Sequence, residues 1–321
     1  MSTKAVNRLF LTMLIVEAAV VFLIGATGLR LTAMGSLILN QLILFVPAVV
    51  FLAATGTKPG FIAHKRIRPV TPLLCLVFTG LCMPLIMVVN MISMLFVENE
   101  VNGLSYMLID TPAWLMFLVI GILGPVNEEF LYRGIFYHSY RRTGRIVAAI
   151  LMSSFLFGVM HLNFNQMSYA IVVGIMSALL VEATGSIVSG MIFHGGINCY
   201  NVAVMVLQRD RLAAANGDTQ ALLNDSLVQL GLSYRQFLLL EIVIYGMIAI
   251  AMTVLAVLLL YGMAALEHRK AEFSDIWKRR QRSAGEKKES LWTVSLVIAV
   301  VLSFLYMIAE LVLPMIVNSV Q

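Results

Sequence analysis

The sequence predicts an all-α fold, a polytopic transmembrane bundle of about eight or nine helices. Of the 321 residues, 60% are hydrophobic and 12% are charged, and the mean hydropathy is +0.92. A soluble domain is about half apolar and roughly a quarter charged. Nine apolar stretches reach or approach the ~20 residues that a helix needs to cross the hydrocarbon of a bilayer. They are Leu9–Leu29, Leu31–Ala54, Val70–Val97, Pro112–Phe136, Ile146–Leu162, Met167–Ala183, Ile187–Leu207, Phe237–Leu266 and Leu291–Val317.

The charged residues between these stretches predict the orientation of the chain. Lys and Arg gather in cytoplasmic loops, and the loops are basic around Lys58–Arg68, Arg141–Arg145 and Arg269–Lys288. A more acidic loop contains Glu98, Glu100 and Asp110. Nine spans with the N-terminus inside place every strongly basic loop in the cytoplasm. We therefore expect an integral protein of a bacterial cytoplasmic membrane, and an eight-span variant would change only the C-terminal end.

The chain divides into three parts on this reading. Residues 1–111 supply about three N-terminal spans, residues 112–207 about four central spans, and residues 208–321 the remaining spans with a charged cytoplasmic loop near 267–290. The net charge of +5 is explained by the cytoplasmic loops, so no nucleic acid partner is expected. The bilayer is the predicted environment, and the sequence leaves the oligomeric state open. Three cysteines (Cys75, Cys82 and Cys199) lie in apolar stretches and predict no disulfide framework.

Ionisable groups within the central spans are the main functional signal, because each costs at least about 2.5 kcal/mol to insert and usually faces a cavity or a partner. Glu129 and Arg133 are four residues apart on one helix face and can pair. Glu128 is turned by about 100° from Glu129, so Arg133 cannot serve both carboxylates equally. Glu128 therefore needs another partner.

His161 is the first candidate for that partner. The polar turn Arg141–Arg145 predicts an antiparallel hairpin of its two flanking helices, and Glu128 and His161 lie equally far from the centre of this turn. His194 and Asn198 are four residues apart on a third helix, where Gly195 and Gly196 allow another helix to approach closely. Because His194 follows the cytoplasmic start of its span, the site is expected in the inner half of the bilayer.

Each of these residues has a possible chemical use. A desolvated carboxylate such as Glu128 can act as a general base on water, and His161 can hold the same water or transfer its proton. His194 and Asn198 can donate hydrogen bonds to the oxyanion of a tetrahedral intermediate. Glu128, His161 and His194 could instead ligate one divalent metal such as zinc. The residues alone leave both routes open, although neither an HExxH nor a GxSxG motif is present.

The three motifs "EEFLYR", "FGVMH" and "HGGIN" resemble, in order, the EExxxR, FxxxH and HxxxN motifs of the CPBP family. This family comprises CAAX-processing and bacteriocin-processing intramembrane proteases related to Rce1-type endopeptidases. The resemblance covers roughly Pro112–Leu207. It implies that Glu128 and His161 activate water, that His194 and Asn198 stabilise the oxyanion, and that Glu129 and Arg133 support the site.

A glutamate-type mechanism without a cofactor is favoured over a metalloprotease, because Arg133 satisfies one of two adjacent carboxylates and leaves the other as a tuned base. The substrate would be a peptide or a membrane-associated protein cleaved near the cytoplasmic face. A non-catalytic scaffold or bacteriocin-immunity protein of the same fold is the alternative. A proton-coupled transporter ranks last, because no repeated halves are visible in the sequence. Glu17, Glu241 and Glu310 of the flanking spans are expected to form interhelical hydrogen bonds, and Glu182 could support the site.

Overall fold

A computed structural model of the chain describes residues 1–57, 65–97, 99–214, 227–228, 230–278 and 289–320. Lys58, Glu98 and the basic residues at 279–288, all used above to predict orientation, lie outside these ranges. Among the described residues the fold is all-α, with eight helices that are long and apolar enough to cross a membrane. One shorter apolar helix of 14 residues accompanies them. The predicted polytopic helical bundle is therefore confirmed, and the protein is an integral membrane protein.

The N-terminal helices are α1 (Thr3–Thr27), α2 (Ala33–Ala54), α3 (Thr71–Met94) and the short α4 (Glu100–Met107). The next span, Ala113–Arg141, is continuous but changes its winding along its length. It comprises α5 (Ala113–Met116), the π-helical η2 (Phe117–Leu123), α6 (Gly124–Glu129), the π-helical η3 (Phe130–Tyr137) and α7 (His138–Arg141).

The remaining helices complete the bundle. They are α8 (Ile146–Val159), α9 (Phe164–Thr184), α10 (Ile187–Leu207), the short α11 (Arg209–Ala214), α13 (Tyr234–Leu266), the short α14 (Lys270–Ser274), the 3₁₀ turn η4 (Asp275–Trp277) and α15 (Val294–Val320). Side-chain oxygens of Asn163, Ser186 and Ser233 cap the starts of α9, α10 and α13. These polar residues explain where the three helices begin.

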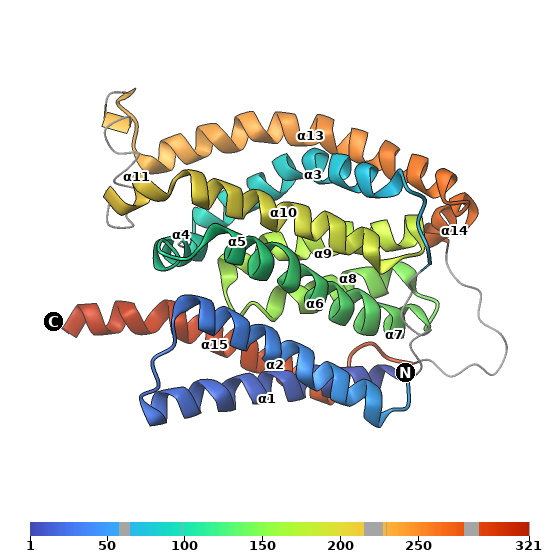
Figure 1. Cartoon of the computed structure of the whole chain (residues 1–321), viewed down its shortest axis with the longest axis horizontal. Helices are drawn as coiled ribbons and strands as arrows, with labels where there is room; N and C mark the ends of the chain where they lie inside the picture. Colours follow the sequence, from blue (N-terminus) through green and yellow to red (C-terminus); the bar gives the residue numbers. More distant parts are fainter. Residues whose placement is uncertain (58–64, 98, 215–226, 229, 279–288, 321) are drawn as a thin grey trace.

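The long helices run along one common direction, with α9 and α10 near the middle (Figure 1). α3 packs against α13, α9 and α10, whereas α1 packs against α2 and α15. α2 also contacts α6, η2 and η3, which joins the N-terminal helices to the central span. The proposed division into three chain segments is thus not a division into three separate packing units, and it stays a prediction about function.

The N-terminus and the last described residues lie at opposite ends of the bundle (Figure 1). Most of the described basic residues belong to segments at the end that holds the N-terminus, where α7 and α14 also lie, whereas Arg30, Arg209, Arg211 and Arg235 belong to segments at the other end. Two of the basic residues at the N-terminal end donate hydrogen bonds to backbone carbonyls of other segments: Lys65 Nζ donates to Glu267 O at 3.0 Å, and Arg145 donates to Glu289 O at 2.6 Å. We call this end the basic end.

Candidate active site

The buried ion pair between Glu129 and Arg133 is the polar centre of the bundle. Arg133 Nη1 lies 2.9 Å from Glu129 Oε1, and both side chains are 0% exposed. The two residues stand on either side of the boundary between α6 and η3, and π-helical segments often occur at functional sites. The predicted pairing of Glu129 with Arg133 is confirmed.

Neighbouring helices are shaped to fit this pair. The Arg133 guanidinium carbon lies 4.8 Å from the centre of the Phe157 ring, a cation–π contact. A Cβ atom at Gly190 would lie 2.8 Å from Glu129 Oε2, and one at Gly174 would lie 3.0 Å from Arg133 Nη2. Only glycine at these two positions allows α10 and α9 to approach the pair so closely.

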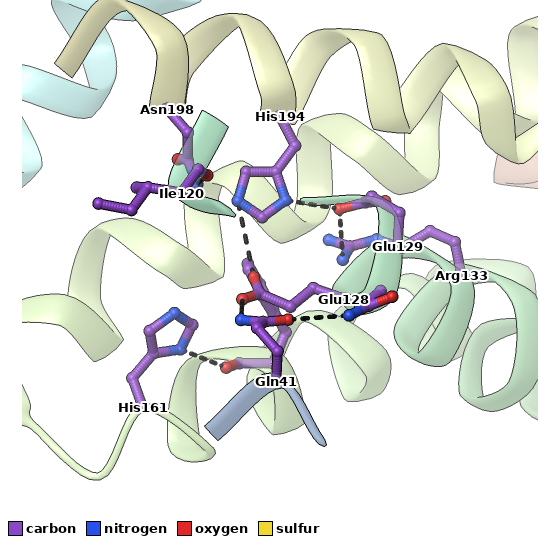
Figure 2. A network of polar contacts seen from close by, with 10 residues as sticks. Gln41, Ile120, Glu128, Glu129, Arg133, His161, His194 and Asn198 are labelled. Carbon is purple, nitrogen blue, oxygen red and sulfur yellow. Dashed lines mark hydrogen bonds and ion pairs between the residues drawn. The ribbon is translucent and has the colours of Figure 1, made fainter. Parts of the chain in front are cut away.

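His194 lies between the two adjacent glutamates (Figure 2). Its Nδ1 is 3.2 Å from Glu129 Oε1, and its Nε2 is 3.7 Å from Glu128 Oε2. Since Glu129 is pinned by Arg133, the imidazole ring is held with its Nε2 toward Glu128. Sequence analysis placed His194 with Asn198 as an oxyanion donor and did not predict its contact with both carboxylates.

Asn198 is anchored to the helix that carries the glutamates. Its Nδ2 donates to Ile120 O at 3.0 Å. In the π-helical η2, the Gly124 N–H bonds to Val119 O, five residues earlier. By the same pattern, the backbone donor to Ile120 O would be residue 125. That residue is Pro125, which has no N–H. Asn198 supplies the missing donor, and the second hydrogen on its amide nitrogen has no acceptor among the described residues.

Close packing of glycines brings α10 to this position. A Cβ at Gly195 would lie 3.2 Å from Gly121 O, and a Cβ at Gly196 would lie 3.1 Å from Thr79 Oγ1 of α3. The predicted close approach of other helices at these two glycines is confirmed.

His161 follows directly after α8 and is fixed by its own backbone. Its Nδ1 is 2.8 Å from Phe157 O. A carbonyl oxygen only accepts, so Nδ1 carries the hydrogen and Nε2 of the neutral ring is an acceptor. Leu162 then adopts a left-handed conformation with φ of 52° and turns the chain toward α9. The expected pairing with Glu128 is not seen, because Glu128 contacts Gln41 and His194 instead.

Phe157 packs against both imidazoles and the guanidinium of the site. Its ring centre is 5.0 Å from that of His161 and 5.5 Å from that of His194, in both cases nearly perpendicular. The side chain is only 1% exposed. Phe157 therefore fixes the relative orientation of two helices that each carry a candidate catalytic histidine.

Gln41 of α2 is the site residue that sequence analysis missed. Its Nε2 lies 3.4 Å from Glu128 Oε1, and its Oε1 accepts from Asn127 Nδ2 at 3.3 Å. The available signal was the polar pair Asn40-Gln41 within an otherwise apolar span. Amides in a span seek polar partners, but the sequence did not reveal which partner.

A cavity of about 280 Å³ connects these side chains. Glu128, His161, His194 and Asn198 all line it, and so does Gln41. The four candidate residues are thus brought to one cavity, with Glu129 and Arg133 buried behind its wall.

The cavity extends from the middle of the bundle away from the basic end. It reaches Leu37 near the start of α2, Leu104 of α4, Gln166 near the start of α9 and Asn201 near the end of α10. These helix termini all lie at the end opposite to the N-terminus (Figure 1). Glu128 lies near the centre of its span and His194 in the half of α10 nearer the basic end, so the expectation of a site in the half of the bundle next to the basic loops stays a prediction.

The candidate metal ligands do not form a metal site. Within the described ranges, no three His, Cys, Asp or Glu side chains are close enough together to hold a metal ion, and Glu128, His161 and His194 are all described. Their donor types suit zinc, but their arrangement does not fit it.

Predictions were also made for two further glutamates, Glu17 and Glu182. Glu17 lines the same cavity, and its Oε2 has no hydrogen-bond partner among the described residues, so the predicted interhelical bond is wrong for this oxygen. Glu182 accepts hydrogen bonds from Tyr137 and Arg141 near the basic end. It ties helices together there and contacts no candidate catalytic residue.

Of three comparisons with known proteins, one found a match. No curated protein and no solved structure matches the chain. Residues 110–200 match the family model of the type II CAAX prenyl endopeptidase Rce1-like proteins. That range contains Glu128, Glu129, Arg133, His161, His194 and Asn198, the residues of the three motifs. Residues 110–200 are therefore similar to the Rce1-like type II CAAX prenyl endopeptidase family.

Proposed function

We propose that the protein is an intramembrane endopeptidase that hydrolyses a peptide bond of a peptide or membrane-associated protein. The similarity of residues 110–200 to the Rce1-like family supports a CAAX-type intramembrane protease. The observation that carries the proposal is the unequal environment of the two adjacent carboxylates. Glu129 is fully buried against Arg133, whereas Glu128 is 15% exposed and lines the cavity. Of these two carboxylates, only Glu128 is available to act on water.

Glu128 and His161 activate the attacking water in this proposal. The carboxylate of Glu128 accepts one hydrogen of the water, and Nε2 of neutral His161 accepts the other. Glu128 takes the proton as the water oxygen bonds to the peptide carbonyl carbon. Both side chains line the same cavity, and each is held by a separate contact, Glu128 by Gln41 and His161 by Phe157 O.

His194 and Asn198 stabilise the oxyanion that forms when the carbonyl π bond opens. Asn198 offers the second hydrogen of its amide nitrogen, since the first is used by Ile120 O. When His194 is protonated on both nitrogens, Nδ1–H donates to Glu129 and Nε2–H is available to the oxyanion. Collapse of the intermediate breaks the C–N bond, and protonated Glu128 returns its proton to the leaving amine. Each such donor typically contributes about 10²–10³ in rate.

We propose that these steps proceed without a metal. Arg133 neutralises Glu129, so one base remains in the pair, and the three candidate ligands are not grouped as a metal requires. No step of the mechanism depends on an ion.

The positive-inside rule supports an orientation with the N-terminus and the basic end in the cytoplasm. The cavity then extends from the middle of the membrane toward the side away from the cytoplasm, and cleavage takes place near the middle, at the depth of Glu128. Single cysteines at Arg142 and Asn201, in a background without the native cysteines, test this orientation. A membrane-impermeant maleimide added to intact cells should label Asn201→Cys and not Arg142→Cys; the reverse pattern would overturn the orientation.

Purified protein in detergent tests the proposed activity with a proteome-derived peptide library. Wild type should cleave a subset of peptides, whereas Glu128→Ala and His161→Ala should not, although both remain membrane-inserted and folded. Cleavage by both variants at the wild-type rate would overturn the mechanism. A wild-type protein that captures one specific peptide without cutting it would instead favour the scaffold or immunity function.

A further inference from the structure

The N-terminal helix α2 reaches the carboxylate that the proposed mechanism uses. Residues 33–54 lie outside the part of the chain that matches the Rce1-like family. Nevertheless α2 packs against α6 and both π-helical segments of the central span. Figure 2 shows Gln41 projecting from this helix toward Glu128. The contact joins a flanking span to the candidate catalytic base.

Each oxygen of Glu128 faces a side chain from a different helix. Gln41 Nε2 of α2 lies 3.4 Å from Oε1, and His194 Nε2 of α10 lies 3.7 Å from Oε2. Both separations are at or beyond the long end of direct hydrogen bonds, so the carboxylate retains lone pairs for a water molecule. Among the described residues, Gln41 is the one side chain that donates a hydrogen bond to Glu128.

The amide of Gln41 is itself oriented. Asn127 Nδ2 donates to Gln41 Oε1 at 3.3 Å, which directs Nε2 toward Glu128. Gly124 provides the surface on which the amide lies, because a Cβ there would be 3.5 Å from Gln41 Nε2. Gly124 and Glu128 are four residues apart and so share one helix face. Asn127, Gln41 and Glu128 thus form a short chain of polar contacts at the cavity wall.

We propose that Gln41 is a positioning residue of the active site, which holds Glu128 in the orientation for proton transfer. The inference rests on the proposed function, since it assigns a role to the base of that reaction. It follows that residues 110–200 alone do not form a complete site. A base misplaced by about 1 Å can cost on the order of 100-fold in rate, whereas peptide binding by other cavity residues does not depend on Gln41.

Kinetics of Gln41→Leu, Gln41→Glu and Asn127→Leu test the inference, with a peptide that wild type cleaves. Leucine is apolar and of similar size, so it should leave insertion and thermal stability unchanged. We expect kcat of Gln41→Leu to fall by about 10- to 100-fold with KM unchanged. Gln41→Glu should be slower still, because a second carboxylate repels Glu128. Asn127→Leu should show a smaller loss of the same kind. Gln208→Leu, at the exposed end of α10, is the matched control and should behave as wild type.

The outcomes separate this inference from the proposed function. Wild-type kcat in Gln41→Leu, together with an inactive Glu128→Gln, would overturn the role of Gln41 and leave the protease intact. A fall in thermal stability that accounts for lost activity would make Gln41 a packing residue and also overturn it. If wild type cleaves no peptide, or if Glu128→Gln is fully active, both proposals fail.

Discussion

Nε2 of His194 lies 3.7 Å from Oε2 of Glu128. This separation exceeds that of a direct hydrogen bond, and both atoms belong to residues that line one cavity. A water or a substrate oxygen in that cavity can therefore approach both groups. The other imidazole nitrogen is fixed by Glu129, so the adjacent glutamates have separate tasks. In the proposed mechanism, Glu129 holds the imidazole and Glu128 acts on water.

Loss of one partner of the buried ion pair should lower the free energy of unfolding far more than loss of both partners. Arg133→Leu leaves the carboxylate of Glu129 buried without its cation, and this typically costs about 3–5 kcal/mol. We expect a clear drop in the free energy of unfolding, measured by denaturation in detergent micelles.

The double variant Glu129→Leu/Arg133→Leu is the control for this prediction. Apolar replacement of both partners of a buried ion pair often leaves the stability nearly unchanged. The stability of the double variant should therefore return toward that of wild type, although the double variant should not cleave peptides. A double variant as unstable as Arg133→Leu would show that packing around the pair, rather than the unpaired charge, causes the loss.

Gly190→Ala should displace Glu129 and lower activity. The new Cβ would lie 2.8 Å from Glu129 Oε2, so the carboxylate, the ion pair or α10 must move. Overpacking of this kind typically costs about 1–3 kcal/mol. Gly246→Ala in α13 is the matched control, because a Cβ there has no atom within 4 Å. It should be neutral or stabilising by up to about 1 kcal/mol. Equal thermal shifts in both variants would contradict the close approach at Gly190.

Phe157→Leu should lower kcat more than its effect on stability explains. The leucine loses the aromatic ring that contacts Arg133, His161 and His194. Phe273→Leu is a fair comparison, since Phe273 is 2% exposed and contacts Tyr261 instead. We expect similar drops in melting temperature for the two variants and a loss of kcat only for Phe157→Leu. Matching activities would show that Phe157 serves packing alone.

The sequence was a good guide to helices because span length and apolar composition are local properties. The predicted stretch Ile187–Leu207 coincides with α10, and Leu31–Ala54 differs from α2 by two residues. The pairing of Glu129 with Arg133 was also predictable, since helical geometry alone places them on one face.

Contacts between helices that are distant in the chain were less predictable. Counting residues from the turn predicted that Glu128 and His161 lie at the same depth in the membrane. This count could not show that His194 and Gln41 are the residues that contact Glu128. The bond from Asn198 to Ile120 O depends on the π-helical winding before Pro125, which composition does not reveal. Glu17 was assigned a partner because polar groups in spans usually have one, yet it faces the cavity.

The most direct test of the central claim compares cleavage rates of wild type and Glu128→Gln, each with and without a metal chelator. Glutamine keeps the size of the side chain but cannot accept the proton of water. We predict that wild type retains its rate in chelator, whereas Glu128→Gln loses at least about 100-fold under both conditions. Loss of wild-type activity in chelator with recovery on added zinc, or a Glu128→Gln variant as fast as wild type, would contradict Glu128 as a metal-free general base.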